Sequence, residues 1–229
     1  MSCCFISDVH LSATNDNSVF LNWLASLNAE VEQLYILGDF FDAWSNTELK
    51  AAWCIEIINA LFKASQQRQI FIMLGNHDFL LDSQFAKLAN VTIIVTDVFL
   101  LQWEGKNILL MHGDTLVAKD LSYLIFRRVI RTRLVRFLYS ILSKKNKLRL
   151  ISLIKSSSDT KGRYVNICHD KVHKVVSEHG EGVDYLICGH FHSRQKFEVA
   201  TACGTTKVLV LGAWVGGDLN DGRFFCLNQ

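Results

Sequence analysis

The sequence of 229 residues contains no proline, no Cys-x-x-Cys pair and no apolar run of membrane-spanning length. Since a transmembrane helix needs about 20 apolar residues in succession, an integral membrane protein is not expected. The N-terminus lacks the basic and apolar regions of a secretory signal, and it reads as the first strand of a fold. The seven cysteines are odd in number and lie mostly in apolar runs. They disfavour a disulfide framework and a zinc ribbon, and they indicate buried thiols in a reducing compartment.

Charge is distributed unevenly along the chain, although the formal net charge is only +2. Half of the residues are hydrophobic and a fifth are charged, as in a globular domain. Between Lys119 and Arg149, ten basic residues accompany a single acid, Asp120, which gives this segment a charge of +9. The remaining 14 basic and 21 acidic residues give −7. The basic segment is therefore suited to contact anions or acidic lipid.

Five short apolar runs alternate with polar clusters. The runs at 3–7, 34–37, 70–74, 108–111 and 185–188 are each followed directly by Asp, His or Gly, and such runs are typical of buried strands. Apolar residues at helical spacing lie between the early runs: Phe20, Trp23, Leu24 and Leu27, then Ile55, Ile58, Leu61 and Phe62. Hairpins are expected at 98–111 and around Gly204. The pattern predicts an α/β fold with one mixed sheet, or two packed sheets with helices outside.

The ends of these runs supply seven potential metal ligands. They are Asp8, His10, Asp39, Asn76, His112, His190 and His192. Seven carboxylate, imidazole and amide groups are too many for one tetrahedral ion, and they suit two ions about 3.5–4 Å apart that share a carboxylate. A set of nitrogen and oxygen ligands without thiolate favours Mn, Fe or Zn. A single such His or Asp would more simply be structural, but five clusters in succession favour a dinuclear centre.

The order D-x-H, G-D, G-N-H-D, H-G-D, G-H-x-H resembles that of the calcineurin-like metallophosphoesterases, and the motifs span residues 8 to 192. The resemblance implies a four-layer α/β/β/α sandwich. It implies one metal ion on Asp8, His10, Asp39 and His192, and a second on Asp39, Asn76, His112 and His190, with Asp39 bridging. It also implies that His77, oriented by Asp78, stabilises or protonates the leaving oxygen of a phosphate ester. A loop-capping role is the alternative for His77.

Four further stretches narrow the resemblance: 35–44 (YILGDFFDAW), 75–81 (GNHDFLL), 111–116 (MHGDTL) and 210–214 (VLGAW). They are similar to the UDP-2,3-diacylglucosamine diphosphatases of lipid A synthesis. This similarity implies two Mn²⁺ ions and cleavage of a UDP-linked diacylated glucosamine to UMP and 2,3-diacylglucosamine 1-phosphate. It implies a cytoplasmic protein attached peripherally to the inner membrane. The implied substrate contacts are Asn76, His77, Asp120, Ser156, Thr160, Arg163 and His190.

The chain departs from that pattern at two places. His77 stands where the diphosphatases usually have Arg, and the usual G-H-T-H-R-P reads GHFHSR at 189–194. Two other classes of function therefore stay open. One is a metallophosphoesterase acting on another phosphodiester, nucleotide or phosphoprotein. The other is a non-enzymatic scaffold of the same fold, which the complete set of metal ligands disfavours.

A basic, helical insertion is expected at about 115–161, within a single domain over 1–229. At 100° per residue, Leu134, Val135, Phe137, Leu138, Ile141 and Leu142 share one side of a helix, and Arg133, Arg136, Tyr139 and Ser140 share the other. Such a helix is typical of a lid over acyl chains or a membrane-surface contact, and a cap packed on the sandwich is the alternative. Nucleic acid is not expected as a partner, because the segment is aliphatic and the rest of the chain is acidic. The oligomeric state is left open.

Overall fold

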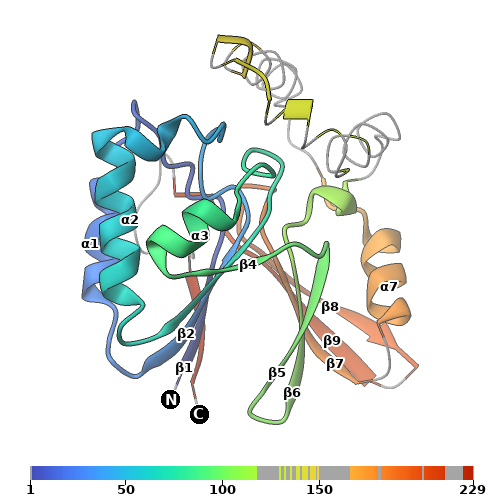
Figure 1. Cartoon of the computed structure of the whole chain (residues 1–229). Coiled ribbons are helices and arrows are strands. Elements are labelled where there is room, and N and C mark those ends of the chain that lie inside the picture. The colour runs from blue at the N-terminus through green and yellow to red at the C-terminus, as the bar shows by residue number, and fades with distance from the viewer. Residues whose placement is uncertain are drawn as a thin grey trace.

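The computed structural model describes residues 2–117, isolated positions between 129 and 149, and residues 166–179, 182–202, 204–214 and 224–228. Its two five-stranded sheets face each other, with helices on both outer sides (Figure 1). This arrangement confirms the expected four-layer α/β/β/α sandwich. The sequence left open one mixed sheet or two packed sheets, and the structure has two packed sheets.

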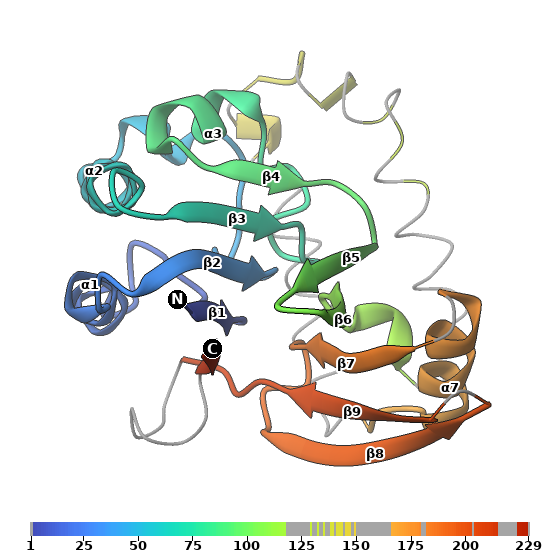
Figure 2. The same ribbon diagram turned by 90° about the horizontal axis from the view of Figure 1, so that it is seen from below.

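The first sheet has the order β10-β1-β2-β3-β4. Its strands are β1 (Ser2–Ile6), β2 (Val31–Leu37), β3 (Gln69–Met73), β4 (Thr92–Ile94) and β10 (Phe224–Asn228). The strands β1 to β4 are parallel, and β10 joins the edge antiparallel to β1. The outer face of this sheet is covered by α1 (Ser18–Ser26), α2 (Ala52–Ala64) and α3 (Ser83–Ala89) (Figure 2).

The second sheet has the order β5-β6-β7-β9-β8. Its strands are β5 (Val98–Trp103), β6 (Lys106–Met111), β7 (Val183–Cys188), β8 (Gln195–Thr201) and β9 (Gly204–Val210). Two antiparallel pairs, β5 with β6 and β8 with β9, confirm both expected hairpins. The helix α7 (His169–Glu178) covers the outer face, and short 3₁₀ turns lie at Glu48–Lys50 and Asp114–Leu116.

The strand β1 shows why the apolar runs are continuous. Phe5 points into the core between the sheets, whereas Cys4 and Ile6 point to the core beneath α1 and α2. Because successive side chains face opposite sides of a strand, a sheet covered on both sides needs apolar residues at every position. Phe5 and Ile6 are both fully buried. The strands therefore end abruptly where polar residues begin, and the polar clusters are placed at the open end of the sandwich.

The cysteine prediction is wrong for one pair. Cys4 lies directly opposite Cys226 in the β1–β10 register, and the two form a disulfide. The partners are 222 residues apart in the chain, so the pairing depends on the return of β10 to the first strand. The remaining described cysteines are free thiols, namely Cys3, Cys54, Cys168 and Cys188. Cysteine content consequently no longer argues for a reducing compartment.

The described part of the insertion departs from the expected helix faces at Tyr139. Tyr139, assigned from the sequence to the polar side, is buried against the core beneath α1 and α2, and its hydroxyl donates to the carbonyl of Ser45 at 3.3 Å. Leu138 and Ile141, assigned to the apolar side, are 49% and 65% exposed. The boundaries at 115 and 161 stay predictions, since most of that segment lies outside the described residues. Within the described part of the chain, no helix has the length and apolar character of a membrane span.

Candidate functional site

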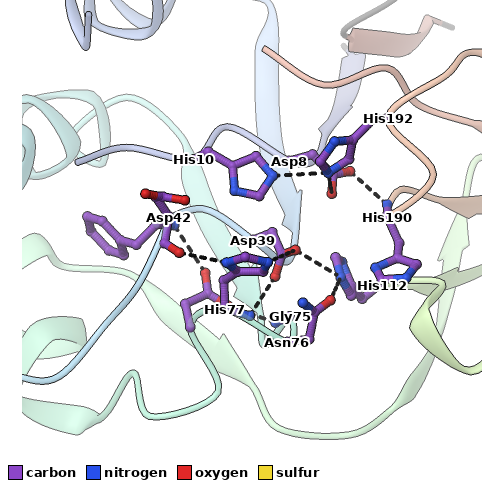
Figure 3. Close-up of polar contacts among 12 residues, drawn as sticks. Asp8, His10, Asp39, Asp42, Gly75, Asn76, His77, His112, His190 and His192 are labelled. Carbon is purple, nitrogen blue, oxygen red and sulfur yellow. Dashed lines mark hydrogen bonds and ion pairs between the residues drawn. The ribbon is translucent and has the colours of Figure 1, made fainter. Parts of the chain in front are cut away.

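The seven predicted metal ligands lie together on loops that follow strands of both sheets (Figure 3). Their positions are Asp8 and His10 after β1, Asp39 after β2, Asn76 after β3, His112 after β6, and His190 and His192 after β7. The strands β1 to β3 are parallel, as are β6 and β7. Their carboxyl ends therefore open at the same end of the sandwich, where α/β sheets commonly bind ligands.

Five of these seven residues have a left-handed backbone. They are Asp8 (φ 54°), His10 (φ 54°), Asp39 (φ 50°), His190 (φ 72°) and His192 (φ 55°). Non-glycine residues rarely adopt this conformation, which costs about 1–3 kcal/mol each and persists where the surroundings enforce it. Such a concentration of strain is typical of a functional site whose side chains must be aimed.

Two glycines leave room for the carboxylates. A Cβ atom at Gly75 would collide with the carboxylate of Asp39, and one at Gly189 would collide with Ser7 and the carboxylate of Asp8. Glycine is therefore required at both positions by close approach of the backbone to the site.

Asp8, His10 and His192 form the first cluster, with one ligand atom from each within 4.8 Å of the others. The Nε2 atoms of His10 and His192 are 3.1 Å apart, and Nε2 of His192 is 3.5 Å from Oδ1 of Asp8. The other carboxylate oxygen of Asp8 accepts the backbone N–H of His190 at 2.8 Å. Among the described side chains, Oδ1 of Asp8 and Nδ1 of His10 are buried without a hydrogen-bond partner. A buried carboxylate oxygen with two imidazole nitrogens close by fits a cation, because an unpaired buried carboxylate oxygen is otherwise costly.

Asp39, His112 and His190 form the second cluster. The Nδ1–H of His112 donates to the carbonyl of Leu37 at 2.9 Å, so its Nε2 faces Oδ2 of Asp39 at 3.4 Å and Oδ1 of Asn76 at 2.9 Å. A backbone partner on one ring nitrogen, which fixes the ring and its tautomer, is typical of histidines that bind metals.

The buried carboxylates make the centre strongly attractive to positive charge. Burial disfavours a charged His112, but Asp39 and Asp8 together outweigh burial and raise its pKa to about 10. Burial and the neighbouring His112 lower the pKa of His190 to about 4, so its imidazole is neutral. A neutral imidazole is the form that binds a metal ion, and a cation would replace the proton that the carboxylates hold on His112.

His77 lies beside the second cluster, but its predicted relation to Asp78 is wrong. The Nδ1–H of His77 donates to the backbone carbonyl of Asp42 at 2.6 Å, and its Nε2 is 3.9 Å from Oδ2 of Asp39. The carboxylate of Asp78 is fully buried and accepts backbone N–H groups instead, from Gly75 at 2.8 Å and Phe40 at 2.7 Å. Asp78 therefore fastens the loop after β3 to the loop after β2.

Asp42 is a residue of the site that the sequence analysis missed. Its carboxylate forms a third cluster with His10 and His77, again with one ligand atom from each within 4.8 Å of the others. The sequence analysis selected polar residues at the ends of apolar runs. Asp42 lies further along the loop after β2, so it was not selected. The remaining predicted substrate contacts, Asp120, Ser156, Thr160 and Arg163, lie outside the described residues and stay predictions.

Comparison with known proteins finds a matching family and similar proteins. A sequence profile described as "Calcineurin-like phosphoesterase" matches residues 1–194, which contain all seven predicted metal ligands. A protein named UDP-2,3-diacylglucosamine hydrolase from Pseudomonas fluorescens (strain Pf0-1) is 33% identical over 217 residues, covering 91% of this chain and 86% of that protein. One of the same name from Shewanella sp. (strain W3-18-1) is 30% identical, covering 92% and 88%. A solved structure of a Vps29 double mutant from Entamoeba histolytica is 15% identical, with a TM-score of 0.46, and covers 100% of this chain and 86% of its own.

Proposed function

The chain belongs to the calcineurin-like phosphoesterase family and is a metal-dependent phosphoester hydrolase, and we propose that it cleaves the pyrophosphate of UDP-2,3-diacylglucosamine. The products are UMP and 2,3-diacylglucosamine 1-phosphate. The main support for a hydrolytic centre is that seven candidate ligands from five strand ends lie close together. The choice of substrate is supported by relatives named for that substrate that are about a third identical to this chain over nine-tenths of its length.

The described residues fit two divalent ions, with Mn²⁺ as the proposed metal. Asp8, His10, Asp39 and His192 would hold one ion, and Asp39, Asn76, His112 and His190 the other. Orphaned polar atoms at Asp8, His10 and His190 support this assignment among the described residues, and nitrogen and oxygen ligands without thiolate suit Mn²⁺. When bound, two such ions neutralise phosphate charge and lower the pKa of a water molecule toward neutrality.

The protein's own contribution to the reaction is positioning. Strained loops hold the ligands before substrate arrives, so little reorganisation is needed during the reaction. His192 is about half exposed whereas Asp8 is fully buried, so the centre opens to solvent on the side of His192. His77 would meet the oxygen that leaves, because its Nδ1 is tied to the Asp42 carbonyl and its Nε2 faces the centre.

The insertion would supply the contact with lipid. Tyr139 is anchored to the loop after β2 through Ser45, and this anchor leaves Leu138, Ile141 and Leu142 exposed beside it. Exposed aliphatic side chains in a basic segment suit acyl chains and an anionic membrane surface. We infer peripheral attachment to the cytoplasmic face of the inner membrane, where a diacylated substrate would reside.

A paired hydrolysis assay tests this function. The chelator-treated protein is supplied with Mn²⁺ and given UDP-2,3-diacylglucosamine in detergent beside bis(p-nitrophenyl) phosphate, which has no acyl chain. We expect Mn²⁺-dependent release of UMP and a much larger kcat/KM for the lipid substrate. Hydrolysis of the small diester without turnover of the lipid would assign the protein to a different phosphoesterase substrate.

A further inference from the structure

The backbone of His10 is held by two hydrogen bonds of different origin. His10 is one of the five left-handed residues of the site, with φ 54°, a conformation that non-glycine residues rarely adopt unless their surroundings enforce it. Its N–H donates to the carbonyl of Asp39 at 3.0 Å, and its carbonyl accepts the side-chain amide of Asn15 at 2.7 Å. The first partner is a backbone group, whereas the second is a side chain that a single substitution removes.

Asp8, the other left-handed residue of the loop after β1, is held differently. Its N–H donates to the carbonyl of Gly38 at 3.1 Å, and its carbonyl accepts the N–H of Trp214 at 3.0 Å. Both partners of Asp8 are therefore backbone groups. Of these four bonds to the peptide groups of Asp8 and His10, only the bond from Asn15 comes from a side chain. The conformation of His10 thus depends on which residue stands at position 15.

Asn15 is itself fixed by the loop that leads from His10 to α1. The Oγ of Ser12 accepts the backbone N–H of Asn15 at 3.2 Å. The side-chain amide of Asn17 pairs with the backbone of Ser12, donating to its carbonyl at 2.9 Å and accepting its N–H at 3.2 Å. Short polar side chains readily form such local bonds to the backbone. The loop therefore holds the half-buried Asn15 against His10 by bonds of its own.

The ring of His10 points into the first cluster. Its Nε2 lies 3.1 Å from Nε2 of His192 (Figure 3), and two imidazole nitrogens this close can bind the same ion. The direction of the ring follows from the backbone that carries it, so a change in the backbone of His10 would turn Nε2 away from His192. The second cluster, of Asp39, His112 and His190, does not include His10. A displaced His10 would therefore weaken one ion position more than the other.

We propose that Asn15 is a positioning residue for the first metal ion, because its side-chain amide holds the carbonyl of His10 and so aims the imidazole at His192. Hydrogen-bond partners behind metal ligands fix the orientation of those ligands and add to metal affinity. Asn15 acts in this way through the peptide group of His10 and not through its ring. Without the amide, the left-handed backbone of His10 loses one of its two restraints and relaxes. The proposal rests on the metal centre of the proposed function, but its test reads ion binding and not hydrolysis.

The experiment is a calorimetric titration of the chelator-treated full chain with Mn²⁺, which gives the number of ions bound and the Kd of each. Asn15→Ala removes the amide donor. We expect one of the two ions to bind about tenfold more weakly, the lower range of the losses seen when the hydrogen-bond partner of a metal ligand is removed, and the other ion to keep its Kd. Ser12→Ala removes the acceptor that fixes Asn15, so it should weaken the same ion by a smaller factor.

Asn107→Ala is the matched control. The side-chain amide of Asn107 also donates to a backbone carbonyl, that of Gly182 at 3.1 Å, and Asn107 is half-buried as well. It stands near the start of β6, whereas His112 follows the other end of this strand. The control variant loses the same kind of bond away from the site, so it should bind both ions with the Kd values of the wild type. Thermal unfolding of the metal-free variants is measured beside the titration.

Wild-type Kd values in Asn15→Ala would overturn the positioning role, whatever the change in Tm, because the amide would then serve stability alone. Equal weakening of both ions would also overturn it, since the amide would then support the whole site and not His10. A wild-type chain that binds no Mn²⁺ would overturn this proposal together with the proposed function. Two ions bound by the wild type and one of them weakened in Asn15→Ala, without turnover of the UDP-lipid, would contradict only the proposed substrate and leave the role of Asn15 standing.

Discussion

Asp78 offers a direct test of what holds the site together. Its two carboxylate oxygens accept the N–H groups of Gly75, Phe40 and Phe41 at 2.8, 2.7 and 3.3 Å, all in a fully buried environment. Asp78→Asn keeps one acceptor oxygen and turns an NH₂ group toward at least one of these buried donors. A buried donor left unpaired costs about 1–3 kcal/mol, so we expect that loss in the free energy of unfolding. For a domain of this size, roughly 2 kcal/mol lowers Tm by about 4–8 °C.

The assay is thermal unfolding of the metal-free protein, together with kcat on bis(p-nitrophenyl) phosphate well below Tm. If Asp78 fastens the loops, the activity lost in Asp78→Asn should return as Mn²⁺ is raised, because the ligands are displaced but none is removed. Asp16→Asn is the matched control, since the exposed Asp16 accepts the N–H and the hydroxyl of Ser18 on a single carboxylate oxygen. Asn keeps that acceptor oxygen, so the Tm should change little. An unchanged Tm for Asp78→Asn, with kcat reduced at every Mn²⁺ concentration, would refute the loop assignment.

The misassignment of Asp78 shows the kind of contact that sequence leaves hidden. Its neighbour in the chain is His77, and the family resemblance implied that Asp78 orients this histidine. The carboxylate instead bonds amides 37 and 38 residues earlier in the chain. Which loops lie against one another depends on strand order, and a one-dimensional pattern does not contain it. The same limit explains Cys4 and Cys226, whose pairing requires β10 to return to β1.

The clustering of the seven proposed ligands was predictable because one physical rule places these residues. A strand covered on both faces is apolar at every position, so the first polar residue marks its end, and parallel strands end at the same edge. Asp39 and His112 both satisfy this rule. Asp42 does not, because it lies further along the loop, where it is held by bonds to Leu11 and to the His77 ring.

Helix faces were predicted less well than strands. The helical spacing in α2 grouped Ile55 and Phe62 with Ile58 and Leu61, yet Ile55 and Phe62 are 44% and 50% exposed, and Cys54 and Ile57 are buried. Apolar residues cover more than one face of this helix, so their spacing alone does not show which face is buried. Tyr139 shows the same effect, because packing against the core and a bond to Ser45 decided its orientation.

Three further predictions concern the ligands, the leaving group and the lipid. Asp39→Asn should lose most activity and bind fewer ions at limiting Mn²⁺, because both ions share this carboxylate; wild-type turnover under that condition would contradict the dinuclear assignment. His77→Ala should lower kcat by roughly 10²–10⁴-fold, the usual scale of acid catalysis, with an unchanged number of ions at equilibrium by metal analysis; a loss of ions alone would make His77 a supporting residue. Leu138→Asp should raise KM for the diacylated substrate and leave the acyl-free diester unaffected, because Leu138 is already 49% exposed and its replacement disturbs little packing. Leu88→Asp on α3 is its control, since Leu88 is a leucine of nearly equal exposure, 47%, outside the insertion. The comparison of the two leucine variants on the two substrates separates lipid contact from stability. If Leu138→Asp impairs both substrates in parallel, the insertion acts as a structural cap, and the exposed aliphatic residues beside Tyr139 do not select the lipid.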